Sequence, residues 1–486
     1  MPRKQLTHEP TLKQKTAKGL FWGGLSNGIQ QVIGAVFGIV TARILSPDDY
    51  GLVGMLAIFT AIANTILESG FTAALVNKKE IRHEDYNAVF WFNLIAGIAL
   101  YILLFFAAPL IARFYGKPEL TNLSRLLFFS FLIGSTGVAH FAVMYKKMMV
   151  KERAMIDIIT VFFSGAVGLT LALNGFAYWG LAIQTVLYTS IAVLFRWYYS
   201  PWRPTFTINF KPLKTMFGFS SKLFITNIFT QVSNNIFSVL LGKLYGERQV
   251  GYYSQGSKWM SMGNTVISGM IFSVAQPVFV EANEDKSRQL NIFRKMIRFG
   301  SFVSFPAMFG LAFIGNEFIL ITVGEKWLES VPFLQLFSVW AAFAYLSGLY
   351  SQLLLSYGKS DLIMIYSIAL SLLILATALI MSEWGILPMV RAYVTVSFLS
   401  IGGWHYFVHK LTGLRFQSVL KDIAPYLGIT LATFALTWLI TKGIENLYLL
   451  LFSKIIIASA LYIVAMRLTN STLFNESLAY IKSNKA

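Results

Sequence analysis

The chain of 486 residues contains no cysteine. That absence excludes disulfide bonds, thiolate metal sites and cysteine nucleophiles together. Charged residues are also scarce, at 13% of the chain, whereas 56% of the residues are hydrophobic. A soluble domain of this length could not hide so much apolar surface from water, so the composition predicts a membrane protein.

Apolar runs follow one another almost continuously along the chain. They are long and unbroken, whereas a transmembrane barrel would show short alternating strands. Because roughly 20 apolar residues of helix cross a bilayer core, we predict an all-α polytopic membrane protein with about 14 transmembrane helices. The predicted spans are residues 18–40, 51–76, 88–112, 123–144, 155–173, 176–195, 218–241, 259–280, 299–323, 331–355, 361–381, 386–407, 422–441 and 446–466.

Acidic residues are few, with 22 Asp and Glu against 40 Lys and Arg and a formal net charge of +18. Nothing here forms a soluble basic domain with interleaved aromatic residues, so we expect no nucleic-acid partner. With the N-terminus inside, about 29 of the basic residues fall on the cytoplasmic side and about seven in outward loops. The excess charge therefore predicts the topology, with both termini cytoplasmic.

The first half of the sequence repeats in the second half. Residues 42–51 recur as residues 242–251, between two spans in each half, and further matches follow at a nearly constant offset. These matches are Asn27, Gln31, Phe37, Gly116, Lys151 and Trp179-Gly180 with Asn227, Gln231, Phe237, Gly324, Lys359 and Trp384-Gly385. The unit holds six predicted spans, an even number, so both copies insert in the same orientation.

We therefore predict two pseudo-symmetric six-helix lobes and two additional C-terminal helices. The N-terminal lobe covers residues 1–200, the C-terminal lobe residues 201–410, and residues 411–486 hold the last two helices and a cytoplasmic tail. A polar connector at residues 196–217 contains three prolines, which do not continue a helix, and it marks the predicted lobe boundary.

A signature follows the first span: Arg43-x-Leu45-x-x-x-Asp49-x-Gly51, echoed at Lys243 and Gly251. With two six-helix lobes and basic first cytoplasmic loops, the chain resembles the polysaccharide-exporter branch of the MOP superfamily over nearly its whole length. It is most similar to O-antigen and exopolysaccharide flippases of the Wzx and teichuronic-acid exporter type.

This resemblance implies a flippase in the bacterial inner membrane. Such proteins move undecaprenyl-diphosphate-linked oligosaccharide repeat units by alternating access, for O-antigen, capsule or exopolysaccharide synthesis. The resemblance implies no cofactor. The partners it implies are lipid-linked oligosaccharide, membrane lipid, and a polysaccharide polymerase with its chain-length machinery.

Polar residues inside spans are costly and tend to face a bundle interior or a watery cavity. Here they concentrate in spans one and seven. Asn27 and Gln31 are four residues apart and share a helix face, and Asn227, Gln231 and Asn234 form the matching face. We predict that these amides line a central substrate cavity and hydrogen-bond sugar hydroxyls. The alternative is that they only join neighbouring helices.

Charges within the predicted spans are few. They are Glu68, Arg125, Asp157, Lys258, Glu317, Arg391 and Lys454. Glu68 is a candidate coupling residue that titrates during transport; alternatively, it pairs with a neighbour near the cytoplasmic end of span two. Arg391 is a candidate for the substrate cavity, because a guanidinium binds phosphate in bidentate fashion. Its alternatives are snorkelling to the outer surface and pairing with Glu383.

Other titratable residues lie near span ends. We expect His140 to be an interfacial histidine rather than a proton relay. Arg43 and Lys243 lie at outward helix ends beside acidic residues, and we expect both to be structural.

Enzymatic motifs are absent from the sequence. Gly358-Lys359-Ser360 ends like a phosphate-binding loop, but Leu353 stands where that motif needs its first glycine. No zinc-ligand spacing and no nucleophile elbow occur, so we expect no catalytic residue and no metal site.

The sequence thus predicts a secondary transporter and not an enzyme, with two alternatives left open. A cation-coupled drug or small-molecule exporter of the same superfamily would need deep carboxylates, for which Glu68 is a fair candidate. A membrane-embedded glycan polymerase would need outward loops that hold two chains, and none here exceeds roughly 20 residues.

Overall fold

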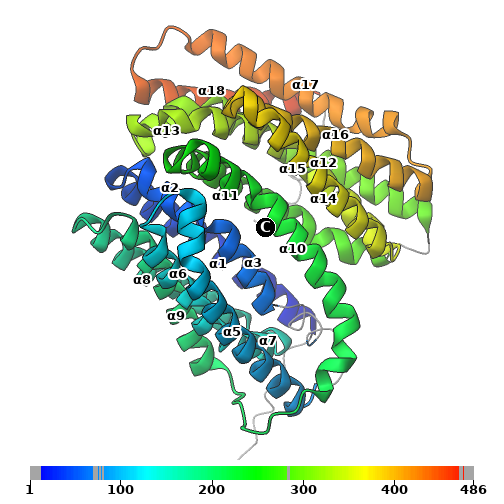
Figure 1. Ribbon diagram of the computed structural model, residues 1–486. Coiled ribbons are helices and arrows are strands. Elements are labelled where there is room, and N and C mark those ends of the chain that lie inside the picture. The colour runs from blue at the N-terminus through cyan, green and yellow to red at the C-terminus, as the bar shows by residue number, and fades with distance from the viewer. Residues whose placement is uncertain are drawn as a thin grey trace, which may run out of the picture. The chain divides into compact units, whose positions relative to one another are not determined.

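In a computed structural model the chain is a bundle of long helices (Figure 1). The structure describes residues 12–68, 75, 78, 81–281, 285–469 and 474. Within these residues the regular elements are all helical, as the composition predicted. They are α1 (Leu12–Ile44), α2 (Pro47–Met55), α3 (Ala57–Glu68), α5 (His83–Tyr115), α6 (Leu120–Ser135), α7 (Val138–Lys146), α8 (Val150–Leu173), α9 (Ala177–Tyr199), α10 (Lys211–Tyr245), α11 (Glu247–Glu281), α12 (Lys286–Phe313), α13 (Gly315–Thr322), η1 (Glu325–Ser330), α14 (Val331–Ser356), α15 (Ser360–Met381), η2 (Ser382–Trp384), α16 (Ile386–Thr412), α17 (Phe416–Thr441) and α18 (Leu447–Leu468).

The predicted spans coincide with these helices. Each span overlaps one helix or two consecutive helices. In the described part of the chain, nine helices are long and apolar enough to cross a membrane, and eleven spans result if each of two bent helix pairs counts as one. The all-α membrane fold is therefore confirmed, while the number fourteen stays a prediction.

Exposed side chains on α5 have the pattern of a lipid-facing helix. Leu103, Phe106 and Leu110 are 65%, 73% and 67% exposed and follow one another at spacings of three and four residues. Such spacing puts them on one face of the helix. A contiguous apolar face of this kind is unfavourable in water and favourable in a bilayer.

Two corners interrupt the first helices. The chain turns by 118° between α1 and α2, where Ser46 caps α2 in a reciprocal capping box. The Ser46 hydroxyl accepts from the Asp49 amide at 3.2 Å, and the Asp49 carboxylate accepts from the Ser46 amide at 2.9 Å. Predicted span four is also broken, since α6 and α7 meet at a 46° bend.

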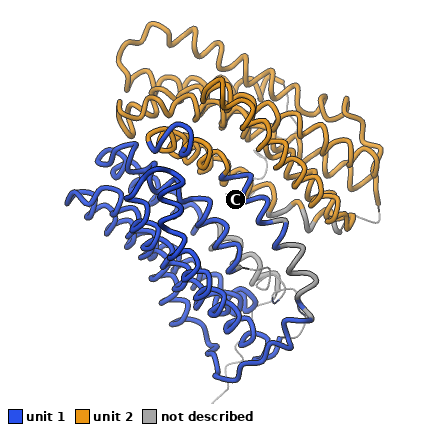
Figure 2. Tube along the Cα trace, viewed as in Figure 1, with its two compact units in different colours: residues 1–235, 242–247 blue, residues 236–241, 248–486 orange. Residues whose placement is uncertain are grey.

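The chain divides into two compact units (Figure 2). Unit 1 comprises residues 1–235 and 242–247, and unit 2 comprises residues 236–241 and 248–486. In unit 1, α8 packs against both α1 and α9, and α5 packs against α6. In unit 2, α12 packs against α14 and α17, and α14 packs against α16. The lobe boundaries drawn from the sequence, near residues 200 and 410, stay a prediction.

The connector between α9 and α10 is fastened to the start of α5. Asn87 accepts from the amide of Thr205 at 2.9 Å and donates to the carbonyl of Thr207 at 2.7 Å. The indole of Trp91 donates to the carbonyl of Thr205 at 2.7 Å. Only residues 200–210 of the predicted connector are non-helical, because residues 196–199 end α9 and residues 211–217, with Pro212, begin α10. This segment is held in place within unit 1.

Backbone conformation differs between matched residues of the internal repeat, which stays a prediction. Gly116 after α5 has φ +71° and ψ 28°, whereas Gly324 before η1 has φ +98° and ψ 171°. The matched pairs Trp179-Gly180 and Trp384-Gly385 also differ in secondary structure. Trp179-Gly180 lies inside α9, whereas Gly385 precedes α16 with a φ of +102°.

Candidate functional site

The signature after the first span builds a close backbone contact. A Cβ at Gly51 would lie 1.8 Å from the carbonyl oxygen of Glu247. The backbone there cannot move aside as a flexible side chain can, so the position admits only glycine. The Lys117 ammonium donates to the Glu247 carboxylate at 2.5 Å, and this hydrogen bond is the main reason why the pKa of Lys117 is raised. The signature thus brings the middle of α2 against the α10–α11 corner within unit 1.

Lys243 at the same corner has a structural role, as expected. Its ammonium donates to the carbonyl of Phe114 at 2.5 Å and lies 4.9 Å from the centre of that ring. A Cβ at Gly242 would lie 2.9 Å from the side chains of Met55 and Tyr115. Small residues and a lysine therefore join the corner to α2 and α5.

The amide face of α1 is separate from the face that packs against α8. Ser26 is buried and reaches the carbonyl of Ala154 on α8 at 3.4 Å, and Gln30 donates to the Ser26 hydroxyl at 2.9 Å. Asn27, one residue on, is exposed, and Gln31 is partly buried. Neither amide side chain is hydrogen-bonded to another described residue. Both are therefore available to a ligand.

The matching amides lie on α10. Asn227 and Gln231 are partly buried and Asn234 is exposed. Within the described residues, the side chains of these three form no hydrogen bond, although the backbone carbonyl of Gln231 accepts from Asn235 at 2.9 Å. Packing through interhelical amide bonds is thus not observed at these positions. That both faces line one cavity stays a prediction.

Arg391 is the sixth residue of α16 and is exposed. Its guanidinium forms no ion pair with any described side chain, Glu383 included. Pairing with Glu383 is therefore not observed, which leaves phosphate binding and snorkelling. Glu68, the candidate coupling residue, ends α3, and its side chain lies outside the described part of the structure.

Buried carboxylates in the described chain are all neutralised by a basic partner. They are Asp85, Glu317 and Asp422, which are 3%, 6% and 4% exposed. Their partners are Lys78 at 2.7 Å, Lys454 at 2.7 Å and Arg294 at 2.7 Å, respectively. Asp157 is partly buried on α8 and lies in the field of Arg153 and Arg196. The three fully buried carboxylates are thus not free to hold a cation, whereas Asp157 forms no ion pair with a described residue.

Two of the remaining charged side chains in the predicted spans form cation–π contacts with aromatic rings. The Arg125 guanidinium lies 4.3 Å from the centre of the Phe105 ring, and the Lys258 ammonium lies 5.4 Å from that of Trp259. A ring face stabilises a cation, more strongly where water is excluded. These charges are therefore compensated locally and are weaker candidates for a transport site.

His140 is enclosed within unit 1, and its expected position at the level of the membrane interface stays a prediction. It is 0% exposed and enclosed by Phe90, Trp197 and Trp202, with ring centres 6.4, 4.3 and 5.2 Å away. Neither ring nitrogen has a hydrogen-bond partner among the described residues. A proton relay needs such partners, so the structure supports a packing role.

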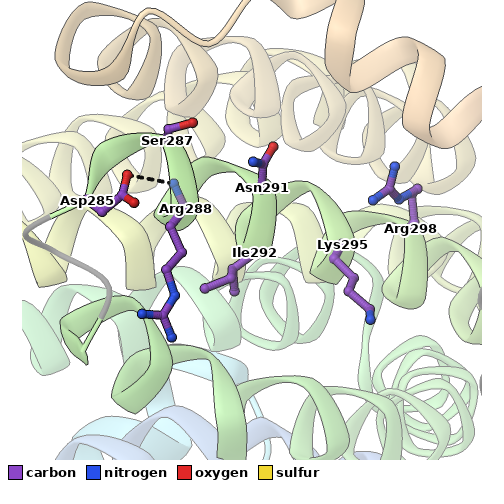
Figure 3. Close-up of a pocket in the computed structure, with 7 residues that line it drawn as sticks. All are labelled: Asp285, Ser287, Arg288, Asn291, Ile292, Lys295 and Arg298. Atoms are coloured by element: carbon purple, nitrogen blue, oxygen red, sulfur yellow. Dashed lines mark hydrogen bonds between the residues drawn. The ribbon is translucent and has the colours of Figure 1, made fainter.

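Two features were missed by reasoning from the sequence. An apolar groove of about 370 Å³ lies between α14, α16 and α17, with walls that include Phe343, Phe398 and Ile423. A basic pocket of about 540 Å³ lies along the first turns of α12 and includes Arg288, Lys295 and Arg298 (Figure 3). The basic pocket could have been predicted from the spacing of Arg288 and Lys295, because residues seven apart on a helix share a face. The groove could not, since it joins three separate helices.

Comparison with known proteins gives similarity over most of the chain. The model of a family described as Polysaccharide biosynthesis protein matches residues 40–332. The chain is 25% identical over 435 residues to the Teichuronic acid biosynthesis protein TuaB of Bacillus subtilis, covering 86% of this chain and 89% of that protein. It is 24% identical over 335 residues to the Lipopolysaccharide biosynthesis protein WzxC of Escherichia coli, covering 68% of this chain and 67% of that protein.

Two solved structures have the same fold. The lipid II flippase MurJ in an inward closed conformation superposes with a TM-score of 0.78 at 14% identity, over 93% of this chain and 99% of that one. An inward-facing multidrug resistance MATE family transporter of the MOP superfamily superposes with a TM-score of 0.61 at 16% identity, over 79% of this chain and 95% of that one. The fold expected from the sequence is therefore confirmed.

Proposed function

The chain belongs to the Polysaccharide biosynthesis protein family, and on that basis we propose that it is a flippase for lipid-linked oligosaccharide in the bacterial inner membrane. Its cargo is undecaprenyl-diphosphate-linked repeat units for O-antigen, capsule or exopolysaccharide, moved by alternating access with both termini in the cytoplasm. The observation that carries the proposal is the similarity to a teichuronic acid biosynthesis protein over 86% of the chain. The shared fold with a lipid II flippase supports it.

Unpaired amides suit the sugar part of such a cargo. Asn27, Gln31 and Asn227 each carry a donor and an acceptor with no partner among the described residues. Sugar hydroxyls need both kinds of group, and an amide provides them without a fixed charge. The apolar groove between α14, α16 and α17 suits hydrocarbon, because its walls are aliphatic and aromatic.

A drug or small-molecule exporter of the same superfamily is the second candidate, favoured by the MATE transporter's similar fold. Cation coupling of that kind calls for an ionised carboxylate that is not already neutralised. The buried carboxylates of the described chain are each paired with Lys or Arg. We therefore rank this candidate below the flippase.

We also propose that the protein is not an enzyme. A polysaccharide polymerase and chain-length machinery would receive its cargo.

A deletion strain tests the proposal directly. Loss of the protein should trap completed lipid-linked repeat units on the cytoplasmic face of the inner membrane. A membrane-impermeant glycosidase or lectin would reach them in inside-out vesicles and not in spheroplasts. Wild-type protein from a plasmid should restore access in spheroplasts. Unchanged surface glycan in the deletion strain would contradict the proposal, and glycan elongation by the purified protein would favour a polymerase.

A further inference from the structure

Phe206 is the most exposed large apolar side chain in the described part of the chain, at 91%. It lies in the non-helical segment at residues 200–210, drawn in green between α9 and α10 (Figure 1). Asn87 on α5 holds both of its neighbours, since it accepts from the amide of Thr205 at 2.9 Å and donates to the carbonyl of Thr207 at 2.7 Å. The hydroxyls of the two threonines also bond each other at 2.9 Å. The backbone on both sides of Phe206 is therefore fastened, while the ring itself stays exposed.

The ring of Phe206 lies beside the lipid-facing side of α5. Its centre is 5.9 Å from that of Trp91, whose indole donates to the carbonyl of Thr205 at 2.7 Å. Trp91 shares a helix face with three exposed isoleucines that follow it at spacings of four, three and four residues, Ile95, Ile98 and Ile102. An exposed apolar face of this kind is favourable in a bilayer and unfavourable in water. Phe206 thus extends a face of α5 that lipid covers.

The contact with Trp91 sets the depth of the segment. Trp91 is the fourth residue of the predicted span at residues 88–112, and it precedes Ile95 by about 6 Å along the helix axis. Trp and Tyr side chains are enriched where the bilayer core meets the headgroups. Tyr198, in the last turn of α9, is also exposed just past the predicted span at residues 176–195. These rings therefore belong to the aromatic belt of one membrane surface, which the charge distribution identifies as the cytoplasmic one.

We propose that residues 205–208 rest in the inner leaflet, with Phe206 inserted between lipids at the boundary of headgroups and hydrocarbon. The occupant of this surface is lipid, because the surface is continuous with the lipid-facing side of α5. Ile208 is exposed as well, so the segment presents two apolar side chains that water would disfavour. The inserted ring keeps the link between α9 and α10 at a fixed depth, whichever cargo the protein moves.

The accessibility of a nitroxide label tests this depth. The chain has no native cysteine, so Phe206→Cys can be labelled at one site in the full-length protein and reconstituted in vesicles of phosphatidylethanolamine and phosphatidylglycerol. Molecular oxygen concentrates in hydrocarbon and an uncharged nickel chelate stays in water, so the ratio of the two accessibilities reports depth. Oxygen should reach the label at residue 206 better than the chelate does.

Two control variants on α5 bracket the result. Ile102 is exposed in the middle of the predicted span, so the label of Ile102→Cys should report lipid. Glu84 is exposed about 10 Å beyond Trp91 along the helix, so the label of Glu84→Cys should report water. The ratio at residue 206 should be several-fold above that at residue 84 and should not exceed that at residue 102.

Two outcomes would overturn the proposal. A ratio at residue 206 equal to that at residue 84 would mean that the segment lies in water. Low accessibility to both reagents would mean that protein covers Phe206, either another part of this chain or a second protein. Because the readout is the surroundings of a label and not transport, its failure is separable from a failure of the flippase proposal.

Discussion

The Lys454 ammonium on α18 donates to the Glu317 carboxylate on α13 at 2.7 Å, and both side chains are at least nine-tenths buried. The lysine also lies 4.6 Å from the centre of the Phe313 ring. Asp422 joins α17 to α12 through Arg294 at 2.7 Å and Arg298 at 3.4 Å. Ion pairs thus join α17 and α18, the two helices outside the predicted repeat, to α12 and α13 within unit 2.

Breaking the Glu317–Lys454 pair should destabilise the protein. Lys454→Met leaves a buried carboxylate without its partner, which costs about 3–5 kcal/mol. The double variant Glu317→Gln/Lys454→Met should recover most of this loss, because no uncompensated charge remains. Thermal unfolding of the purified protein in detergent measures both effects, with Lys410→Met as an exposed control. Wild-type stability of Lys454→Met would show that the pair does not hold α18 in place.

Gly51→Ala should weaken the corner between α2 and the start of α11. Its Cβ would overlap the carbonyl of Glu247, and overpacking of this kind typically costs about 1–3 kcal/mol. Gly34→Ala is the matched control, because a Cβ at Gly34 meets nothing within 4 Å and alanine favours a helix. The unfolding temperature should fall for the first variant and not for the second. A fall in both, or in neither, would contradict the close contact.

The membrane topology can be tested with single introduced cysteines, since the chain has no native cysteine that would also react. A cysteine introduced near Lys117 or Lys326 should react with a membrane-impermeant thiol reagent in intact cells. One near Lys147, or in the loop around Arg203, should react only after permeabilisation. The reverse pattern would invalidate the predicted orientation.

Leucine at Asn27, Gln31, Asn227 or Gln231 should reduce export more than it reduces the amount of protein. Each substitution removes a donor and an acceptor from the proposed cavity wall. Gln30→Leu is the comparison, because Gln30 bonds within α1 beside the α8 contact and should affect protein level first. Normal transport by all four variants would mean that the cavity lies elsewhere.

Arg391→Gln should reduce export roughly tenfold or more if the guanidinium binds a diphosphate, whereas Arg391→Lys should stay partly active. The protein should remain folded and abundant in both cases, since Arg391 is exposed and pairs with no described carboxylate. The measurement is export per amount of protein in the membrane. A snorkelling arginine tolerates both changes, so full export by Arg391→Gln would remove this residue from the site.

The sequence alone determined the class of the protein, the positions of its helices and the non-helical connector before α10. Those features are local, because the length of an apolar run decides a span and Pro201 and Pro204 interrupt the backbone hydrogen bonds of a helix. Proline position alone was not sufficient, since Pro109, Pro306 and Pro425 lie inside helices. The lobe boundary and the shared amide cavity are still predictions, because they concern how whole elements sit together.

Only the tertiary structure decided which charges meet. Glu317 and Lys454 are 137 residues apart, and Arg294 and Asp422 are 128 apart, so no local pattern pairs them. The same holds for Gly51, whose neighbour Glu247 comes from the second half of the chain, and for His140, enclosed by rings from α5, α9 and the connector. A side chain's partners depend on the packing of helices distant in sequence, and each residue's own neighbours along the chain say little about that packing.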